Sequence, residues 1–152
     1  MNHSEWIDPI AGLIDRHHDR GGFLVLFPEY RPDLFVALAG QLGLQSFDYR
    51  AKVMSDHGWD ADRLSLQDLD STLADLAAKG GTLVTNVEAL LSTKNPHECA
   101  DWISSFLDTD QEHTLLIPIV INASQVPDKH PRVHWIPGDA LAEQSFLNRL
   151  VY

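Results

Sequence analysis

The stretch Phe23–Gly43, FLVLFPEYRPDLFVALAGQLG, decides the fold of this chain. Its first five residues, 23–27, form an uninterrupted apolar run, which is typical of a β-strand covered on both faces. Pro32 then fits the first turn of a helix, and Gly43 fits the position just past its end. The leucines between them share one side of that helix, at positions Leu34, Leu38 and Leu42. The stretch therefore predicts a buried strand, a tight loop and a helix in immediate succession.

Apolar periodicity in the rest of the chain predicts an alternation of helices and strands. A first helix is expected over residues 8–20, with Asp8 as its N-cap, and a last helix over 139–151. The expected strands are 23–27, 45–50, 82–86, 115–121 and 132–136. Strands connected through helices favour a mostly parallel sheet with helices on both faces. We therefore expect one α/β domain over 1–152, a three-layer α/β/α arrangement with a five-stranded sheet and a core at 23–137.

Three local patterns refine this prediction. Ser65 followed by Asp68 resembles a capping box, and Asn95 followed by proline fits the start of another helix. Residues 55–63 are polar and acidic and are expected to form a loop. Pro118 lies inside an aliphatic strand, where it cannot donate a ladder hydrogen bond, so we expect a bulge there or a strand that begins there.

The composition indicates an acidic globular protein. Of the 152 residues, 44% are hydrophobic and 22% are charged, and 22 acids against 11 bases give a formal net charge of −11. Such a surface disfavours direct contact with nucleic acid and anionic lipid and favours a basic protein partner. Cys99 is the only cysteine, which excludes an internal disulfide and suits a reducing cytoplasm. No apolar run reaches the roughly 20 residues of a membrane span, so a cytoplasmic protein is expected.

The loop of the opening stretch, PEYRPD, lacks the residues that bind phosphate. In nucleotide-binding α/β proteins such a strand-to-helix turn holds phosphate with backbone N–H groups, glycines and a Lys-Ser/Thr pair. Here Pro28 and Pro32 lack N–H donors, and the two acids, Glu29 and Asp33, would repel an anion. Only Arg31 would attract one.

The order of these patterns resembles the core of P-loop ATPases of the AAA+/RecA type. The resemblance rests on the strand–loop–helix at 23–43, on a strand followed by Asn86-Val87-Glu88, and on an aliphatic strand that ends in Asn122-Ala123-Ser124. The TNVEALL stretch is also similar to the small ATPase-like component of bacteriophage-exclusion (BREX) systems, which carries an Asp-Asn-Ile-Glu type sequence there. The resemblance implies a P-loop NTPase-like topology in which strand 23–27 lies centrally beside strand 115–121.

The same resemblance assigns functional positions, and this chain departs from most of them. The Walker A loop corresponds to residues 28–33, which contain no glycine, lysine, serine or threonine. The Walker B aspartate position carries Thr85, whereas an acid persists at Glu88 and a polar sensor residue at Asn122. Because the cradle lysine and the metal carboxylate are both missing, the sequence argues against ATP hydrolysis and against a bound cofactor.

The resulting functional hypothesis is a non-catalytic ATPase-fold protein that acts by protein–protein interaction, as an adaptor or accessory subunit of a bacterial phage-defence assembly. The candidate partner-binding residues are Tyr30, Arg31 and Trp59, since Tyr, Trp and Arg are enriched as interface anchors. One alternative is a weak nucleotide-binding ATPase that uses Arg31 and Glu88. Others are an acidic DNA mimic, and a receiver-like scaffold with Thr85-Asn86 and Ile136-Pro137 in place of its Asp and Lys.

Other polar clusters contain residues of the kinds that form metal or thiol sites, and none is expected to be one. Asp15, His18 and Asp19 have a chelating spacing on the predicted first helix, which a solvated helix end also explains. The remaining candidates are the acidic group Asp56, His57, Asp60 and Asp62, the run His97, Glu98 and Cys99, and the pair His130 and His134. Cys99 falls on an apolar stripe and is expected to be a buried structural thiol.

Overall fold

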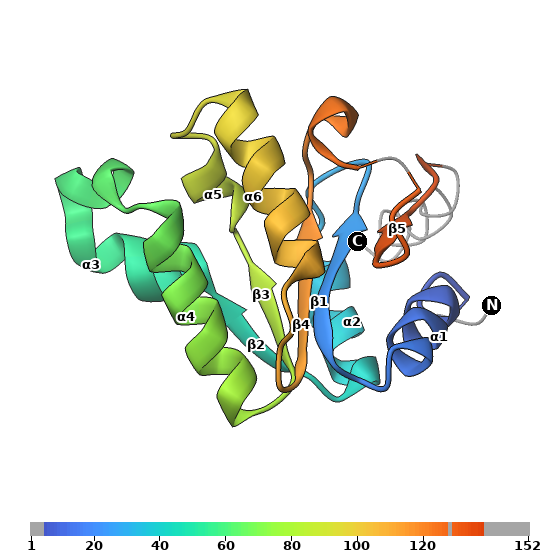
Figure 1. Cartoon of the computed structure of the whole chain (residues 1–152). Coiled ribbons are helices and arrows are strands. Elements are labelled where there is room, and N and C mark those ends of the chain that lie inside the picture. Colours follow the sequence, from blue (N-terminus) through green and yellow to red (C-terminus); the bar gives the residue numbers. More distant parts are fainter. Residues whose placement is uncertain (1–4, 128, 139–152) are drawn as a thin grey trace, which may run out of the picture.

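Figure 1 shows the computed structural model, which describes residues 5–127 and 129–138 as a parallel β-sheet with helices on both faces. The strands are β1 (Gly21–Leu26), β2 (Gln45–Asp48), β3 (Thr82–Thr85), β4 (Thr114–Ile119) and β5 (Val133–Trp135). The α-helices are α1 (Asp8–Arg16), α2 (Pro32–Leu42), α3 (Ser55–His57), α4 (Leu66–Lys79), α5 (Glu88–Leu91) and α6 (Pro96–Asp108). The predicted helix over 139–151 lies outside the described residues. Within the described part, no helix combines the length and apolar character needed to cross a bilayer.

The strand order is β2-β3-β4-β1-β5, and all four neighbouring pairs are parallel. β1 lies inside the sheet, where it pairs with β4 from Gly21↔Thr114 to Leu26↔Ile119. This confirms the expectation of a central first strand beside the aliphatic strand. The order also excludes the receiver-like alternative, because receivers have the strand order 2-1-3-4-5.

Two apolar clusters, one on each face of the sheet, form the core. Helices α4, α5 and α6 pack on one face, against side chains such as Leu24, Leu115 and Ile117. Helices α1 and α2 pack on the other face, against Phe23, Val25 and Leu116. Figure 1 shows this arrangement, with α4 and α6 in front of the sheet and α2 behind it. Consecutive residues of β1 point to opposite faces, so its continuous apolar run is buried on both sides, as predicted.

Pro118 occurs inside an unbroken strand, so the expected bulge or strand start is wrong. Phe27 N–H donates to the carbonyl oxygen of Ile119 (2.9 Å), so Ile119 faces β1. Because backbone groups alternate sides along a strand, Pro118 faces β3 instead. The β3–β4 ladder ends before it, with Leu83↔Leu116 as its last pair. The missing N–H of Pro118 therefore interrupts no pairing with β1.

The structure corrects the predicted bounds of the first helix. Helix α1 ends at Arg16 rather than residue 20, because His18 and Asp19 adopt left-handed backbone angles (φ 60° and 58°). Its N-cap is Ile7, without a side-chain cap, and Asp8 is its first helical residue.

The strand predicted over 45–50 stops at Asp48, and the predicted loop at 55–63 is helical. Asp48 Oδ1 accepts a hydrogen bond from Ala51 N–H (3.0 Å), and a π-helix (Arg50–Met54), α3 and a 3-10 helix (Gly58–Arg63) follow. A side-chain cap thus starts helical backbone where the apolar alternation suggested a longer strand.

The two predicted helix starts are confirmed. The Ser65 and Asp68 side chains form a reciprocal capping box on α4. Asn95 caps α6 by accepting a hydrogen bond from Glu98 N–H (2.8 Å).

Candidate functional site

All five strands are parallel, so their carboxyl ends meet at one edge of the sheet. This edge carries the loop 28–33 after β1, Asp48 at the end of β2, Asn86 and Glu88 after β3, and Asn122 after β4. In open α/β sheets, ligands bind in crevices at this edge. The predicted positions therefore lie on the same edge, and their contacts decide what each can do.

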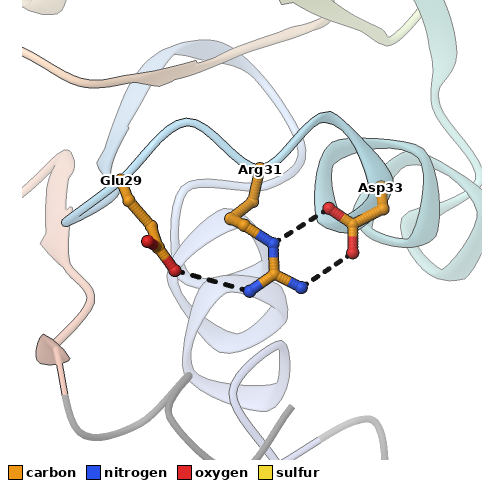
Figure 2. Close-up of polar contacts among 3 residues, drawn as sticks. All are labelled: Glu29, Arg31 and Asp33. Atoms are coloured by element: carbon orange, nitrogen blue, oxygen red, sulfur yellow. Dashed lines mark hydrogen bonds and ion pairs between the residues drawn. The ribbon is translucent and has the colours of Figure 1, made fainter. Parts of the chain in front are cut away.

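Arg31 is held by the two acids of its own loop. Its Nε and Nη2 donate to the two carboxylate oxygens of Asp33 (3.0 and 2.8 Å), and Nη1 lies 3.5 Å from Glu29 Oε1. Figure 2 shows the guanidinium between the two carboxylates. The hydrogen bond with Asp33 raises the pKa of Arg31 and lowers that of Asp33. Only 14% of the Arg31 side chain is exposed, so an anion would have to compete with a bidentate ion pair.

Tyr30 begins a chain of hydrogen bonds that joins three strand ends. Its hydroxyl donates to Asn86 Oδ1 (3.1 Å), and Asn86 Nδ2 donates to Asp48 Oδ1 (2.9 Å). Asn86 has a left-handed backbone (φ 62°), a conformation that asparagine tolerates better than most residues. Sequence patterns did not predict this role for Asp48 and Asn86. The one usable signal was for Asp48, since an Asp three residues before a helical N–H is a capping pattern.

A pocket of about 320 Å³ opens beside these hydrogen bonds, between α2 and the ends of β2 and β3. Tyr30 and Val36 lie on its rim and expose 51% and 70% of their surface. The Tyr30 ring also packs edge-on against Phe35, with 5.6 Å between centroids. The other lining residues are mostly apolar or uncharged: Pro32, Phe35, Ser46, Asp48, Lys52, Leu83, Thr85 and Asn86. Thr85, at the predicted Walker B position, is thus part of this wall.

Glu88 accepts a hydrogen bond from the backbone of the neighbouring strand segment. Its Oε2 lies 3.2 Å from Val120 N, while Oε1 is buried and has no partner among the described residues. Burial raises the pKa of the Glu88 carboxyl, the Val120 hydrogen bond opposes this, and the nearby charge of Asp48 adds to the rise. Glu88 therefore has a defined structural contact at this edge.

Asn122 and Trp59 do not join the site described so far. Asn122 Oδ1 accepts a hydrogen bond from Ser124 N–H (3.0 Å) and so caps the short 3-10 turn Ala123–Gln125. Trp59 lies in the 3-10 helix Gly58–Arg63, and its side chain falls outside the described part of the structure.

In the part of the chain that the structure describes, no three His, Cys, Asp or Glu side chains are arranged to hold a metal ion. His18 and Asp19 follow the end of α1, so the expected chelating spacing with Asp15 does not exist. Asp56 and His57 lie in α3, whereas the side chains of Asp60 and Asp62 are outside the description.

The other candidate residues have structural contacts. Cys99 is buried, its thiol lies 3.1 Å from the carbonyl oxygen of Leu91, and burial raises its pKa. His97 pairs with Asp101 on the exposed face of α6, Glu98 accepts from the Asn95 side chain, and His130 pairs with Asp108. Burial lowers the pKa of His134.

Comparisons of this chain with protein-family models, with curated proteins and with solved structures give no match.

Proposed function

We propose that this chain is a non-catalytic protein of the ATPase fold that acts by protein–protein contact, as an accessory subunit of a multi-protein assembly. One observation carries the proposal: Tyr30 and Val36 are exposed on the rim of a largely apolar pocket at the ligand-binding edge of the sheet. The similarity of the TNVEALL stretch to a bacteriophage-exclusion component favours phage defence as the setting. A position beside phage-defence genes would support that setting.

The polar groups at this edge support contact rather than nucleotide chemistry. The Arg31 guanidinium is paired with Asp33. Asn86 is hydrogen-bonded to both Tyr30 and Asp48. A phosphate would have to displace these contacts and approach two prolines without N–H donors. An apolar side chain could enter the pocket and leave all of them intact.

We define the contact surface as Tyr30, Pro32 and Val36, which line the pocket and are exposed. Tyrosine is a frequent interface hot spot because it buries a large ring at little entropic cost. Arg31, a candidate anchor by residue type, exposes too little of its side chain to be one and instead shapes the loop. With a net charge of −11, the chain suits a basic protein that inserts an apolar side chain between Tyr30 and Val36.

The contact surface can be tested with a photo-crosslinking amino acid at position 30 in the source cells. The captured protein is purified and its affinity is measured for the wild type and for Val36→Asp, Tyr30→Ala and Tyr30→Phe. We expect Val36→Asp and Tyr30→Ala to weaken binding by about 30-fold or more, as hot-spot losses do. Tyr30→Phe keeps the ring and should bind nearly as well as the wild type.

Gln67→Ala, an exposed change on α4 across the sheet, is the control and should bind normally. Val36 is exposed, so Val36→Asp should change the free energy of unfolding by less than about 0.5 kcal/mol. Salt should weaken binding to a basic partner. Unchanged affinity in both Val36→Asp and Tyr30→Ala would remove this surface from the proposal.

Calorimetry separates this proposal from a weak nucleotide-binding enzyme. We expect no measurable heat of binding when ATP and Mg²⁺ are titrated to about millimolar concentration, because the loop lacks glycines and two N–H donors. A saturable isotherm that disappears in Arg31→Ala would instead favour the nucleotide-binding alternative.

A further inference from the structure

A second pocket, of about 390 Å³, lies at the opposite edge of the sheet, where β1 and β4 begin. Its lining is His17, His18, Arg20, Gly21, Asp110, Gln111 and Arg132. Four of these seven residues, the two histidines and the two arginines, have basic side chains, and one is acidic. In a chain with twice as many acids as bases, such a concentration of basic side chains marks a distinct surface.

Arg132 is fixed in this pocket by backbone and ring contacts. Its Nη1 donates to the carbonyl oxygen of Arg20 (2.9 Å), and its guanidinium carbon lies 5.0 Å from the centroid of the buried Phe23 ring. A Cβ at Gly21, where φ is +102°, would lie 2.1 Å from Nη1, so the guanidinium requires a glycine there. No carboxylate among the described residues pairs with Arg132, and its other N–H groups have no acceptor there.

Neighbouring histidines support this geometry. His130 Nδ1 accepts a hydrogen bond from Arg132 N–H, and its Nε2 lies 3.1 Å from Asp108 Oδ1, which holds the turn before β5. His17 packs edge-on against Phe23, and its Nδ1 lies 3.0 Å from the carbonyl oxygen of Leu13. Since a carbonyl only accepts, Nδ1 carries the proton and His17 keeps Nε2 for another partner.

We propose that this pocket binds a small phosphorylated anion. A guanidinium held in place by neutral groups offers its remaining N–H donors to phosphate oxygens in the fork geometry that arginine favours. Arg20, which is exposed and whose carbonyl oxygen accepts from Arg132 Nη1, adds a second cation. Asp110 on the rim opposes an anion and limits its affinity. The site is independent of the contact surface, which lies at the other edge of the sheet.

The test uses inorganic phosphate as the probe and the amide resonances of the ¹⁵N-labelled protein as the readout, with sodium chloride matched for ionic strength. We expect saturable shifts at 17–21, 110–111 and 132, with a Kd of about 1 mM at low salt. Arg132→Gln should weaken binding by about tenfold or more, as loss of a charged donor does. Arg50→Gln removes the same charge from an exposed residue after β2 and should leave binding unchanged.

Two further variants keep the proposal testable if Arg132→Gln unfolds the chain. Arg20→Gln should weaken binding, and Asp110→Asn should tighten it by about two- to fivefold, because each removes one exposed charge. The proposal is overturned if phosphate causes no saturable shift, if Arg50→Gln weakens binding as much as Arg132→Gln, or if Asp110→Asn has no effect. Shifts centred on 28–33 would overturn it as well and would favour the nucleotide-site alternative.

Discussion

Gly22→Ala is expected to lower the free energy of unfolding by about 1–3 kcal/mol, the cost of overpacking a well-packed core. A Cβ at Gly22 would lie 2.6–2.9 Å from three carbons of the Phe106 ring. That ring cannot easily withdraw, because it is buried and stacked on Trp102 with 5.2 Å between centroids. β1 and α6 would therefore have to separate. Urea denaturation of the wild type and the variant measures the change.

Gly40→Ala is the matched control, since a Cβ at Gly40 in helix α2 meets no atom within 4 Å. This change should stabilise the chain by about 0.5–1 kcal/mol through helix propensity. Phe106→Leu should be less harmful in the Gly22→Ala background than in the wild type, because it makes room for the methyl group. Equal stability of Gly22→Ala and the wild type would show that α6 does not pack as closely on β1 as described.

Local sequence chemistry predicted the central part of this fold. The apolar run at 23–27 predicted a strand covered on both faces, and the caps at Ser65 and Asn95 marked helix starts correctly. The same logic failed after Asp48, where alternating apolar residues suggested a longer strand. The Asp48 side chain caps the next turn instead, and this single hydrogen bond to Ala51 N–H, three residues on, outweighed a weak periodic pattern.

The candidate site could be predicted only in part, because its contacts join distant parts of the chain. The pairing of Arg31 with Asp33 is local and could have been anticipated from a two-residue separation. The bond between Tyr30 and Asn86 spans 56 residues and depends on the strand order. Likewise, Arg132 donates to the carbonyl oxygen of Arg20, which is 112 residues away in the sequence. No single stretch of the sequence therefore predicts the second pocket.

Glu88 and Pro118 are coupled through the ladder between β3 and β4. Pro118 faces β3 but has no N–H to donate, and the pairing of these strands stops at Leu116. Val120 is the next residue that faces β3, and its N–H donates to Glu88 Oε2. A side-chain carboxylate thus replaces the strand acceptor that the ladder no longer supplies.

Glu88→Ala is therefore expected to destabilise the chain by about 1–3 kcal/mol, because it leaves the Val120 N–H without an acceptor. Glu88→Gln keeps an acceptor oxygen and serves as the control. Burial raises the pKa of Glu88, so the stability that this group contributes is present below the ordinary glutamate pKa and is lost as pH rises through the folded pKa. The Glu88→Gln side chain cannot ionise. The free energy of unfolding of this variant should therefore increase relative to that of the wild type as the pH rises through that range.

Urea denaturation of the three proteins between about pH 4 and about pH 7 measures both effects. The result also distinguishes two roles for the acid that the ATPase resemblance singles out. A carboxylate kept for metal or nucleotide chemistry is a buried charge whose removal stabilises the fold, so Glu88→Ala would then match or exceed the wild type in stability. A carboxylate that accepts the Val120 N–H beyond the end of the β3–β4 ladder is needed by the fold. In that case Glu88→Ala loses stability while Glu88→Gln retains it. The hydrogen bond to Val120 predicts the second result.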